Sequence, residues 1–152
     1  MNDNSFIRVT RNPYEEPHHV NLVVTASNGR TRGELEIYAN ATDLLAFSQA
    51  LRSPPKFGQD IAVWELGSEE PERRFAFHFR IRVFQVSATG QCAVEVRLCN
   101  NGKAPEREIV EFSMLALPAD LERLSKLFEQ FGALAHRVLE WRVTEGELHE
   151  HV

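Results

Sequence analysis

The chain has 152 residues, of which 43% are hydrophobic and 26% are charged, and it carries a net charge of −5. This length supports one ordinary hydrophobic core, and the composition is that of a folded globular protein rather than a disordered one. The longest apolar runs are only a few residues, and the N-terminus lacks the basic-then-apolar order of a signal peptide, so we expect a cytoplasmic protein without a membrane span.

The negative charge is concentrated in the last third of the chain. Residues 1–105 carry twelve acidic and twelve basic side chains, whereas residues 106–152 carry ten acidic and five basic ones. Because phosphate binding needs a basic surface, this distribution argues against nucleic acid as a partner. The acidic end could attract a basic partner, or it could simply be a solvated helix and tail.

The sequence contains no recognisable catalytic or metal-binding motif. It has no glycine-rich phosphate loop, no nucleophile elbow and no C-x-x-C pair. Cys92 and Cys99 lie in one predicted strand, about 23 Å apart at about 3.3 Å per residue, so they cannot form a disulfide with each other. His149 and His151 lie in a terminal segment without rigid geometry. We therefore predict no catalytic residue, no cofactor and no metal ion.

The two ends of the chain show weak periodicity. Residues 1–19 read as a loosely held lead-in that includes a short edge strand at Phe6 to Val9, and residues 144–152 read as a polar tail. Between them we expect all the regular structure of a single domain spanning residues 1–152.

The first firm unit is a β-hairpin. Asn28-Gly29 supplies the residues that a two-residue type I′ turn needs. With this turn at the centre of the hairpin, the residue numbers of each facing pair in the two strands add up to 57. Leu22 then faces Leu35, so the turn and the apolar pattern give the same register.

A helix and a short strand follow. Asn40 or Thr42 can cap a helix that runs through about Leu51 and that Ser53-Pro54-Pro55 ends. Residues 61–66 are then predicted as a strand of mixed pattern before an acidic turn at residues 67–72. Trp64 in this strand is either a core aromatic or an anchor on a binding surface.

The longest strand covers residues 75–86, where apolar residues alternate with Ala, His and Arg. With a turn centred on Thr89-Gly90 the numbers of paired residues sum to 179, so that Ile81 faces Leu98, provided that the loop has an even number of residues or carries a bulge. The next turn makes pairs sum to 208. These three strands share one polar face, which holds Arg80, Arg82, Glu95, Arg97 and Glu111, with Phe84 and Ile109 as apolar members.

A second helix begins at Pro118 and carries an apolar stripe up to Phe131, with Gly132 as its end, and a last strand covers residues 139–143. The order of elements predicts an α+β fold: a mainly antiparallel sheet of about six to seven strands, with two helices packed on one face and the other face exposed.

The exposed sheet face is the first candidate site. Arginine and aromatic residues are favoured at interaction hot spots, so Arg80, Arg82, Phe84 and Arg97 are candidate partner-binding residues, together with Trp64. A solvated sheet face is the alternative, and a homodimer would be one way of covering it. A second hypothesis is a small-molecule-binding protein or enzyme with a pocket near Trp64 and His78. His78 is otherwise a surface histidine within a charge ladder, and Glu69-Glu70 look solvated.

The run from Val86 to Leu98, the segment Phe112 to Leu115 and the helix Leu121 to Phe131 resemble the C-terminal half of WapI-type bacterial immunity proteins and their small bacterial relatives. The resemblance spans residues 35–132, and Gln91 stands where a histidine is expected. It implies a cytoplasmic, acidic, non-enzymatic module that binds and blocks another protein, a toxin domain, and it carries over no catalytic residue.

Overall fold

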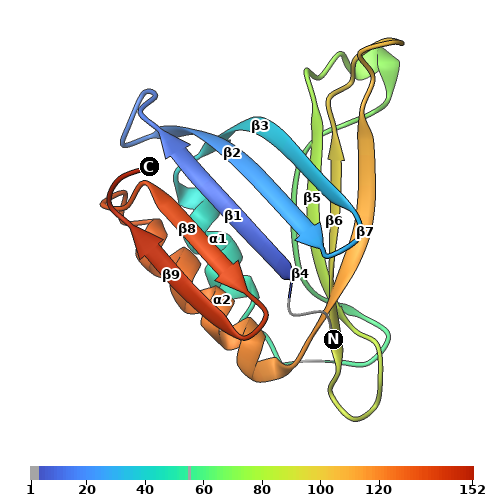
Figure 1. The fold of residues 1–152 in the computed structure, drawn as a ribbon, viewed down its shortest axis with the longest axis vertical. Coiled ribbons are helices and arrows are strands. Elements are labelled where there is room, and N and C mark those ends of the chain that lie inside the picture. The colour runs from blue at the N-terminus through green and yellow to red at the C-terminus, as the bar shows by residue number, and fades with distance from the viewer. Residues whose placement is uncertain (1–3, 55) are drawn as a thin grey trace.

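A computed structural model describes residues 4–54 and 56–152, and Figure 1 shows them as two antiparallel sheets and two helices. A short 3₁₀ turn lies at Pro71–Arg73. The strands and helices, in chain order, are β1 (Ser5–Asn12), β2 (His19–Asn28), β3 (Arg32–Asn40), α1 (Thr42–Ala50), β4 (Asp60–Gly67), β5 (His78–Gln85), β6 (Cys92–Cys99), β7 (Ile109–Ala116), α2 (Pro118–Phe131), β8 (Val138–Arg142) and β9 (Glu145–His149).

The α+β class and the antiparallel pairing are confirmed, but the strands are divided differently from the prediction. The described residues form nine strands rather than six or seven, and these make two sheets rather than one. The five-stranded sheet has the order β3-β2-β1-β8-β9, and the four-stranded sheet has the order β4-β5-β6-β7. The two sheets meet where a β-carbon added at Gly33 would lie 3.0 Å from Cβ of Val110, so the strands β3 and β7 approach closely there.

The predicted lead-in is a central strand. β1 pairs with β2 on one side and with β8 on the other, and Ile7 and Val9 are fully buried opposite Trp141 and Leu139. Burial alternates only from Ile7 to Asn12, and the polar residues in and around this segment hide the pattern in the sequence. The prediction of a loosely held segment at residues 1–19 was therefore wrong for β1.

The predicted polar tail also contains a strand. β9 pairs with β8 at the edge of the five-stranded sheet, with Leu148 opposite Leu139. An edge strand with one solvated face needs few apolar residues, so Glu145 to His149 gave no hydrophobic signal. The interpretation of residues 144–152 as a tail was wrong for this segment.

The predicted registers were confirmed in one pairing and were wrong by two residues in two others. Pairs of β6 and β7 sum to 208, and Arg97 faces Glu111 as predicted. Pairs of β5 and β6 sum to 177, so Ile81 faces Val96 rather than Leu98. Pairs of β2 and β3 sum to 59 instead of 57. A shift of two residues preserves which side chains share a face, so the inward and outward assignments remain valid.

The positions of the two turns explain both shifts. The β2–β3 connection spans Asn28 to Thr31, whose ends are joined by a backbone hydrogen bond of 3.1 Å, and the Asn28 side chain accepts from the backbone N–H groups of Arg30 and Thr31. The β5–β6 loop closes with a hydrogen bond from Val86 N–H to the Gln91 carbonyl. The first turn is thus centred on Gly29-Arg30 rather than on Asn28-Gly29, and the second loop is centred on Ala88-Thr89 rather than on Thr89-Gly90.

Both helices pack on the same side of the five-stranded sheet, behind it in Figure 1, and α1 also contacts β4 of the other sheet. At their centre Phe47 and Phe128 meet edge to face, with ring centroids 5.2 Å apart, and Trp64 of β4 lies 5.6 Å from Phe47. The buried Ser48 hydroxyl donates to the Ser125 carbonyl at 2.7 Å and ties the helices together. One continuous core joins both sheets and both helices.

Candidate functional site

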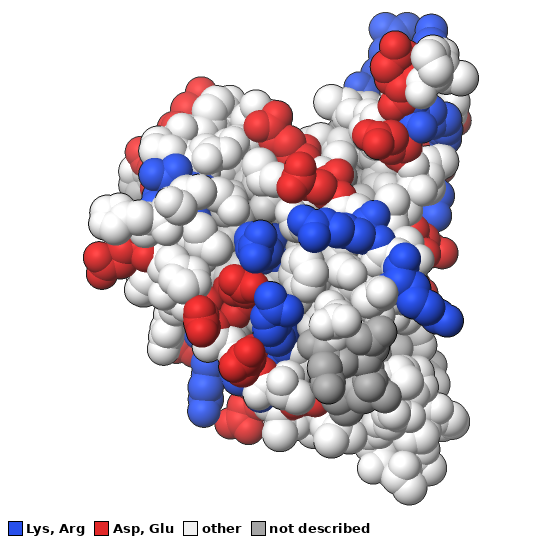
Figure 2. Space-filling view, in the orientation of Figure 1, with Lys and Arg blue, Asp and Glu red and all other residues white. Residues whose placement is uncertain are grey.

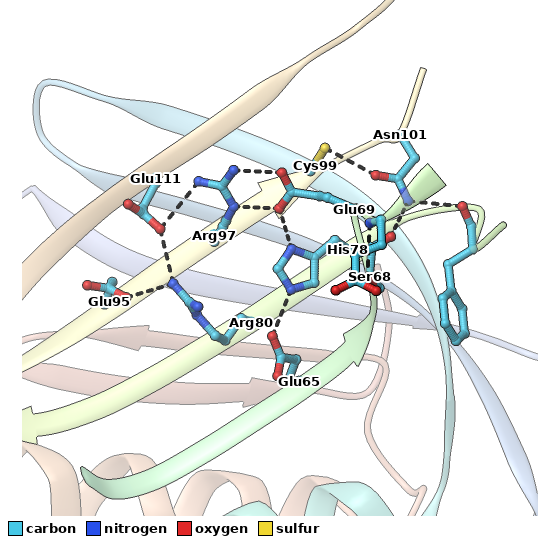
Figure 3. A network of polar contacts seen from close by, with 12 residues as sticks. Glu65, Ser68, Glu69, His78, Arg80, Glu95, Arg97, Cys99, Asn101 and Glu111 are labelled. Atoms are coloured by element: carbon cyan, nitrogen blue, oxygen red, sulfur yellow. Dashed lines mark hydrogen bonds and ion pairs between the residues drawn. The ribbon is translucent and has the colours of Figure 1, made fainter. Parts of the chain in front are cut away.

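The outer face of the four-stranded sheet carries the candidate site. Residues on alternate positions of β4 to β7 point away from the helices, and they form rows across the four strands. We call this surface the ion-pair face, defined by Asp60, Glu65, Glu69, His78, Arg80, Arg82, Glu95, Arg97 and Glu111. Figure 3 labels all of these residues except Asp60 and Arg82.

The arginines predicted as site residues lie together on this face and are held by carboxylates. Arg80 donates to Glu95 at 3.0 Å and to Glu111 at 3.1 Å, while Arg82 donates to the other oxygen of Glu95 at 3.2 Å. Arg97 reaches Glu111 at 3.4 Å. Each guanidinium is therefore fixed before any partner arrives, which lowers the conformational entropy lost on binding.

Glu69 closes one end of the face, although it belongs to the acidic turn after β4. Its two oxygens accept from Arg97 Nε at 2.6 Å and Arg97 Nη2 at 2.7 Å, which is the bidentate geometry of a strong pair. The hydrogen bonds from Arg97, followed by those from His78, lower the pKa of Glu69 to about 2 despite its partial burial. The prediction of a solvated carboxylate was therefore wrong for Glu69.

His78 lies between two carboxylates and is buried, at 8% exposure, instead of lying at the surface as predicted. Its Nε2 contacts Glu65 Oε2 at 2.8 Å, and its Nδ1 contacts Glu69. Because both ring nitrogens face carboxylates, neither is left to accept a proton from a substrate. The geometry therefore gives His78 a role in holding the Glu69 turn on the sheet rather than one in acid–base catalysis.

The opposite end of the face is apolar. Phe84, Ala93 and Leu115 form one row across β5, β6 and β7, and Val63 lies in the next row. The Arg82 guanidinium lies 4.3 Å from the centre of the Phe84 ring, a cation–π contact. Leu115 is 41% exposed and Val63 is 45% exposed. Phe84 thus joins the predicted arginines at the centre of one continuous surface.

Trp64 does not belong to this surface. It is 5% exposed and lies on the inner face of the sheet, with its ring 4.9 Å from Phe79. The interpretation of Trp64 as a core aromatic holds, and its place among the candidate partner-binding residues was wrong. Since His78 points to the outer face, the sheet itself separates the two residues that were proposed to share a pocket.

An apolar cavity does exist elsewhere, with a volume of about 410 Å³. It lies where the end of α1 meets the start of α2, and Leu51, Ile61, Cys92 and Leu121 are among its lining residues. Burial raises the pKa of the Cys92 thiol, so this cysteine stays protonated and is not an activated nucleophile. The cavity has the size of a small-molecule site but shows no arrangement of catalytic groups.

Comparison of the chain with protein-family models, with curated proteins and with solved structures found no match. Within the described residues, no group of three or more histidine, cysteine or acidic side chains could hold a metal ion. The same part of the chain has no helix long and apolar enough to cross a membrane. The ion-pair face is therefore the candidate site on the basis of its geometry alone.

Proposed function

We propose that this protein is a non-enzymatic protein-binding module of the toxin-immunity kind, acting in the cytoplasm, and that its partner docks on the ion-pair face. The observation that carries this proposal is that fixed arginines lie beside a partly exposed apolar row on one open sheet, in which Phe84 is half-buried and Leu115 is exposed. In the part of the chain that the structure describes, no helix and no second sheet covers this face (Figure 1). Arginine and aromatic anchors surrounded by ordered polar groups are the usual composition of binding hot spots.

The charge of the face indicates the kind of partner. Three guanidinium groups face five carboxylates, from Asp60, Glu65, Glu69, Glu95 and Glu111, so that the carboxylates outnumber the guanidinium groups by two. The whole chain is also negative, at −5. A basic protein surface complements this field and would be steered to it. A toxin domain that acts on nucleic acid would have such a surface.

The five-stranded sheet provides a contrast. In Figure 2 its outward face shows basic and acidic side chains interspersed, and Arg8 and Arg142 both pair with Glu140, at 3.3 and 3.0 Å. Phe6 is only 9% exposed beneath Arg8, Arg32 and Arg142. Among the described residues this face has no pair of exposed aliphatic side chains like Leu115 and Val63, so the four-stranded sheet is the better docking surface.

The proposal can be tested by capturing the partner and then expressing it. The tagged protein is incubated with lysate of its host, and the eluted complex is sized and identified by mass spectrometry. We expect one stoichiometric basic partner that arrests growth when produced alone and loses this effect on co-expression. A doubled size with no second protein would indicate a homodimer, and a harmless partner would contradict the immunity role.

A pair of arginine variants separates the docking face from the rest of the surface. Arg82→Ala removes a residue whose side chain is 35% exposed and ion-paired, and Arg8→Ala removes one that is 40% exposed and ion-paired on the other sheet. Exposed ion pairs contribute at most about 1 kcal/mol to folding, so both variants should fold. We expect Arg82→Ala to lose protection against the partner and Arg8→Ala to keep it. Equal protection by both would contradict the assigned face.

A further inference from the structure

A second surface feature lies outside the ion-pair face, at a corner formed by the only two tyrosines of the chain. Tyr14 lies between β1 and β2, and Tyr38 lies on β3, an edge strand. Their ring centroids are 5.0 Å apart and the ring planes meet at 65°. Both rings are exposed, Tyr14 by 41% and Tyr38 by 50%, so the corner is open to solvent.

The two rings form part of a shallow cleft of about 270 Å³, which we call the tyrosine cleft. Four parts of the chain converge on it: the β1–β2 connection with the start of β2, the end of β3, the first turn of α1 and the end of β4. Its lining consists of Tyr14, Glu15, His19, Tyr38, Ala39, Asn40, Asp43 and Leu66.

The carboxylates of this cleft differ from those of the ion-pair face, because they have no cation beside them. Within residues 4–54 and 56–152, neither Glu15 nor Asp43 forms an ion pair, and one oxygen of Asp43 accepts from Asn40 N–H at 3.2 Å. Glu15 is exposed. Two carboxylates without a counter-ion beside two aromatic rings favour a positively charged ligand.

Two other groups affect the charge at this point. The first turn of α1 carries the positive end of the helix dipole, which disfavours a cation, but Asp43 lies in that turn and offsets it. His19 lines the cleft and is exposed. The carboxylates of Glu15 and Asp43 therefore provide the negative charge of the cleft.

We propose that the tyrosine cleft binds the side chain of an arginine presented by another protein. A planar guanidinium can stack on a tyrosine ring and still form two parallel hydrogen bonds to a carboxylate, which an ammonium group cannot do. The angled rings of Tyr14 and Tyr38 supply the stacking surface, and Glu15 or Asp43 supplies the carboxylate. This site shares no residue with the ion-pair face, so it stands or falls independently of the proposed function.

The presence of only two tyrosines makes the test simple. The full chain is labelled with 3-fluorotyrosine, which gives two ¹⁹F NMR signals, and Tyr14→Phe and Tyr38→Phe assign them. The protein is titrated with a short peptide containing one arginine, with the same peptide containing citrulline in its place, and with a lysine version. Citrulline has nearly the same shape as arginine but carries no charge.

We expect the arginine peptide to shift both signals with a dissociation constant of about 1–10 mM, as for one exposed cation–π and ion-pair contact. The citrulline peptide should leave them unchanged, and the Glu15→Gln, Asp43→Asn double variant should bind the arginine peptide about tenfold more weakly. Equal shifts with citrulline, equal affinity for lysine, or no shift at all would overturn the proposal. A shift with free methylguanidinium but not with the peptide would overturn it too, because the ligand would then be a small cation.

Discussion

Replacing Glu69 by glutamine should destabilise the protein in a way that depends on pH. The pKa of Glu69 falls from 4.5 to about 2 on folding, mainly because Arg97 donates two hydrogen bonds to it. At about 1.4 kcal/mol per pKa unit, this fall in pKa corresponds to a stabilisation of about 3 kcal/mol in the absence of solvent screening. The carboxylate is 23% exposed, so solvent screening reduces the expected contribution to about 1–2 kcal/mol.

The direction of the pH dependence follows from the difference between the folded-state and unfolded-state pKa of Glu69. A carboxylate with a lowered folded-state pKa stabilises the protein above its unfolded pKa of 4.5, and this stabilisation is lost as the pH falls from 4.5 to about 2. The free energy of unfolding, measured by urea titration, should be about 1–2 kcal/mol lower for Glu69→Gln than for the wild type at pH 7. The two proteins should converge towards pH 2.

Glu70→Gln is the matched control, because Glu70 is the next residue, is exposed and forms no ion pair among the described residues. Its free energy of unfolding should stay within about 0.5 kcal/mol of the wild type. A gap for Glu69→Gln that persists unchanged from pH 7 to pH 2, or an equal loss for Glu70→Gln, would refute the role given to the bidentate pair.

Two further predictions concern the turn that carries Glu69 and the core behind the sheet. A β-carbon at Gly67, which has φ of +77°, would lie 2.0 Å from the Phe77 carbonyl oxygen, whereas one at Gly58, with φ of +86°, meets nothing within 4 Å. In thermal unfolding Gly58→Ala should lower the free energy of unfolding by about 1–2 kcal/mol, because alanine disfavours a positive φ. Gly67→Ala should lower it by at least about 1 kcal/mol more, because its β-carbon also meets the Phe77 carbonyl. Equal losses for the two variants would contradict this clash. Phe128→Ala should cost about 3–5 kcal/mol, because it opens a cavity beside Phe47, and a loss below about 1 kcal/mol would contradict the packing described.

The central part of the fold could be predicted because the alternation of apolar residues and the positions of the turns indicated the same strands there. Alternation along β5, β6 and β7 gave the two faces of the sheet, and a two-residue error in register does not exchange them. The terminal strands could not be found in this way. β1 is recognisable only through its partners β2 and β8, and β9 is an edge strand with little apolar character.

The candidate site was predictable to the same extent. Arg80, Arg82, Phe84 and Arg97 share a face because they occupy alternate positions of paired strands. Glu69 was missed because no periodic pattern indicates where a loop folds back, and only the structure shows its contact with Arg97. Trp64 was misplaced because β4 has a register shift between Asp60 and Ala62, so its pattern alone did not define an inner face.

The most direct test of the central claim is the affinity of the captured partner for two leucine-to-aspartate variants. Leu115, 41% exposed, lies in the apolar row of the ion-pair face, and Leu45, 44% exposed, lies on α1 away from it. If the partner docks on this face, isothermal titration should show binding weakened about 30-fold or more by Leu115→Asp and unchanged by Leu45→Asp. Unchanged affinity for Leu115→Asp in a folded protein would show that the partner, and hence the function, belongs to another surface.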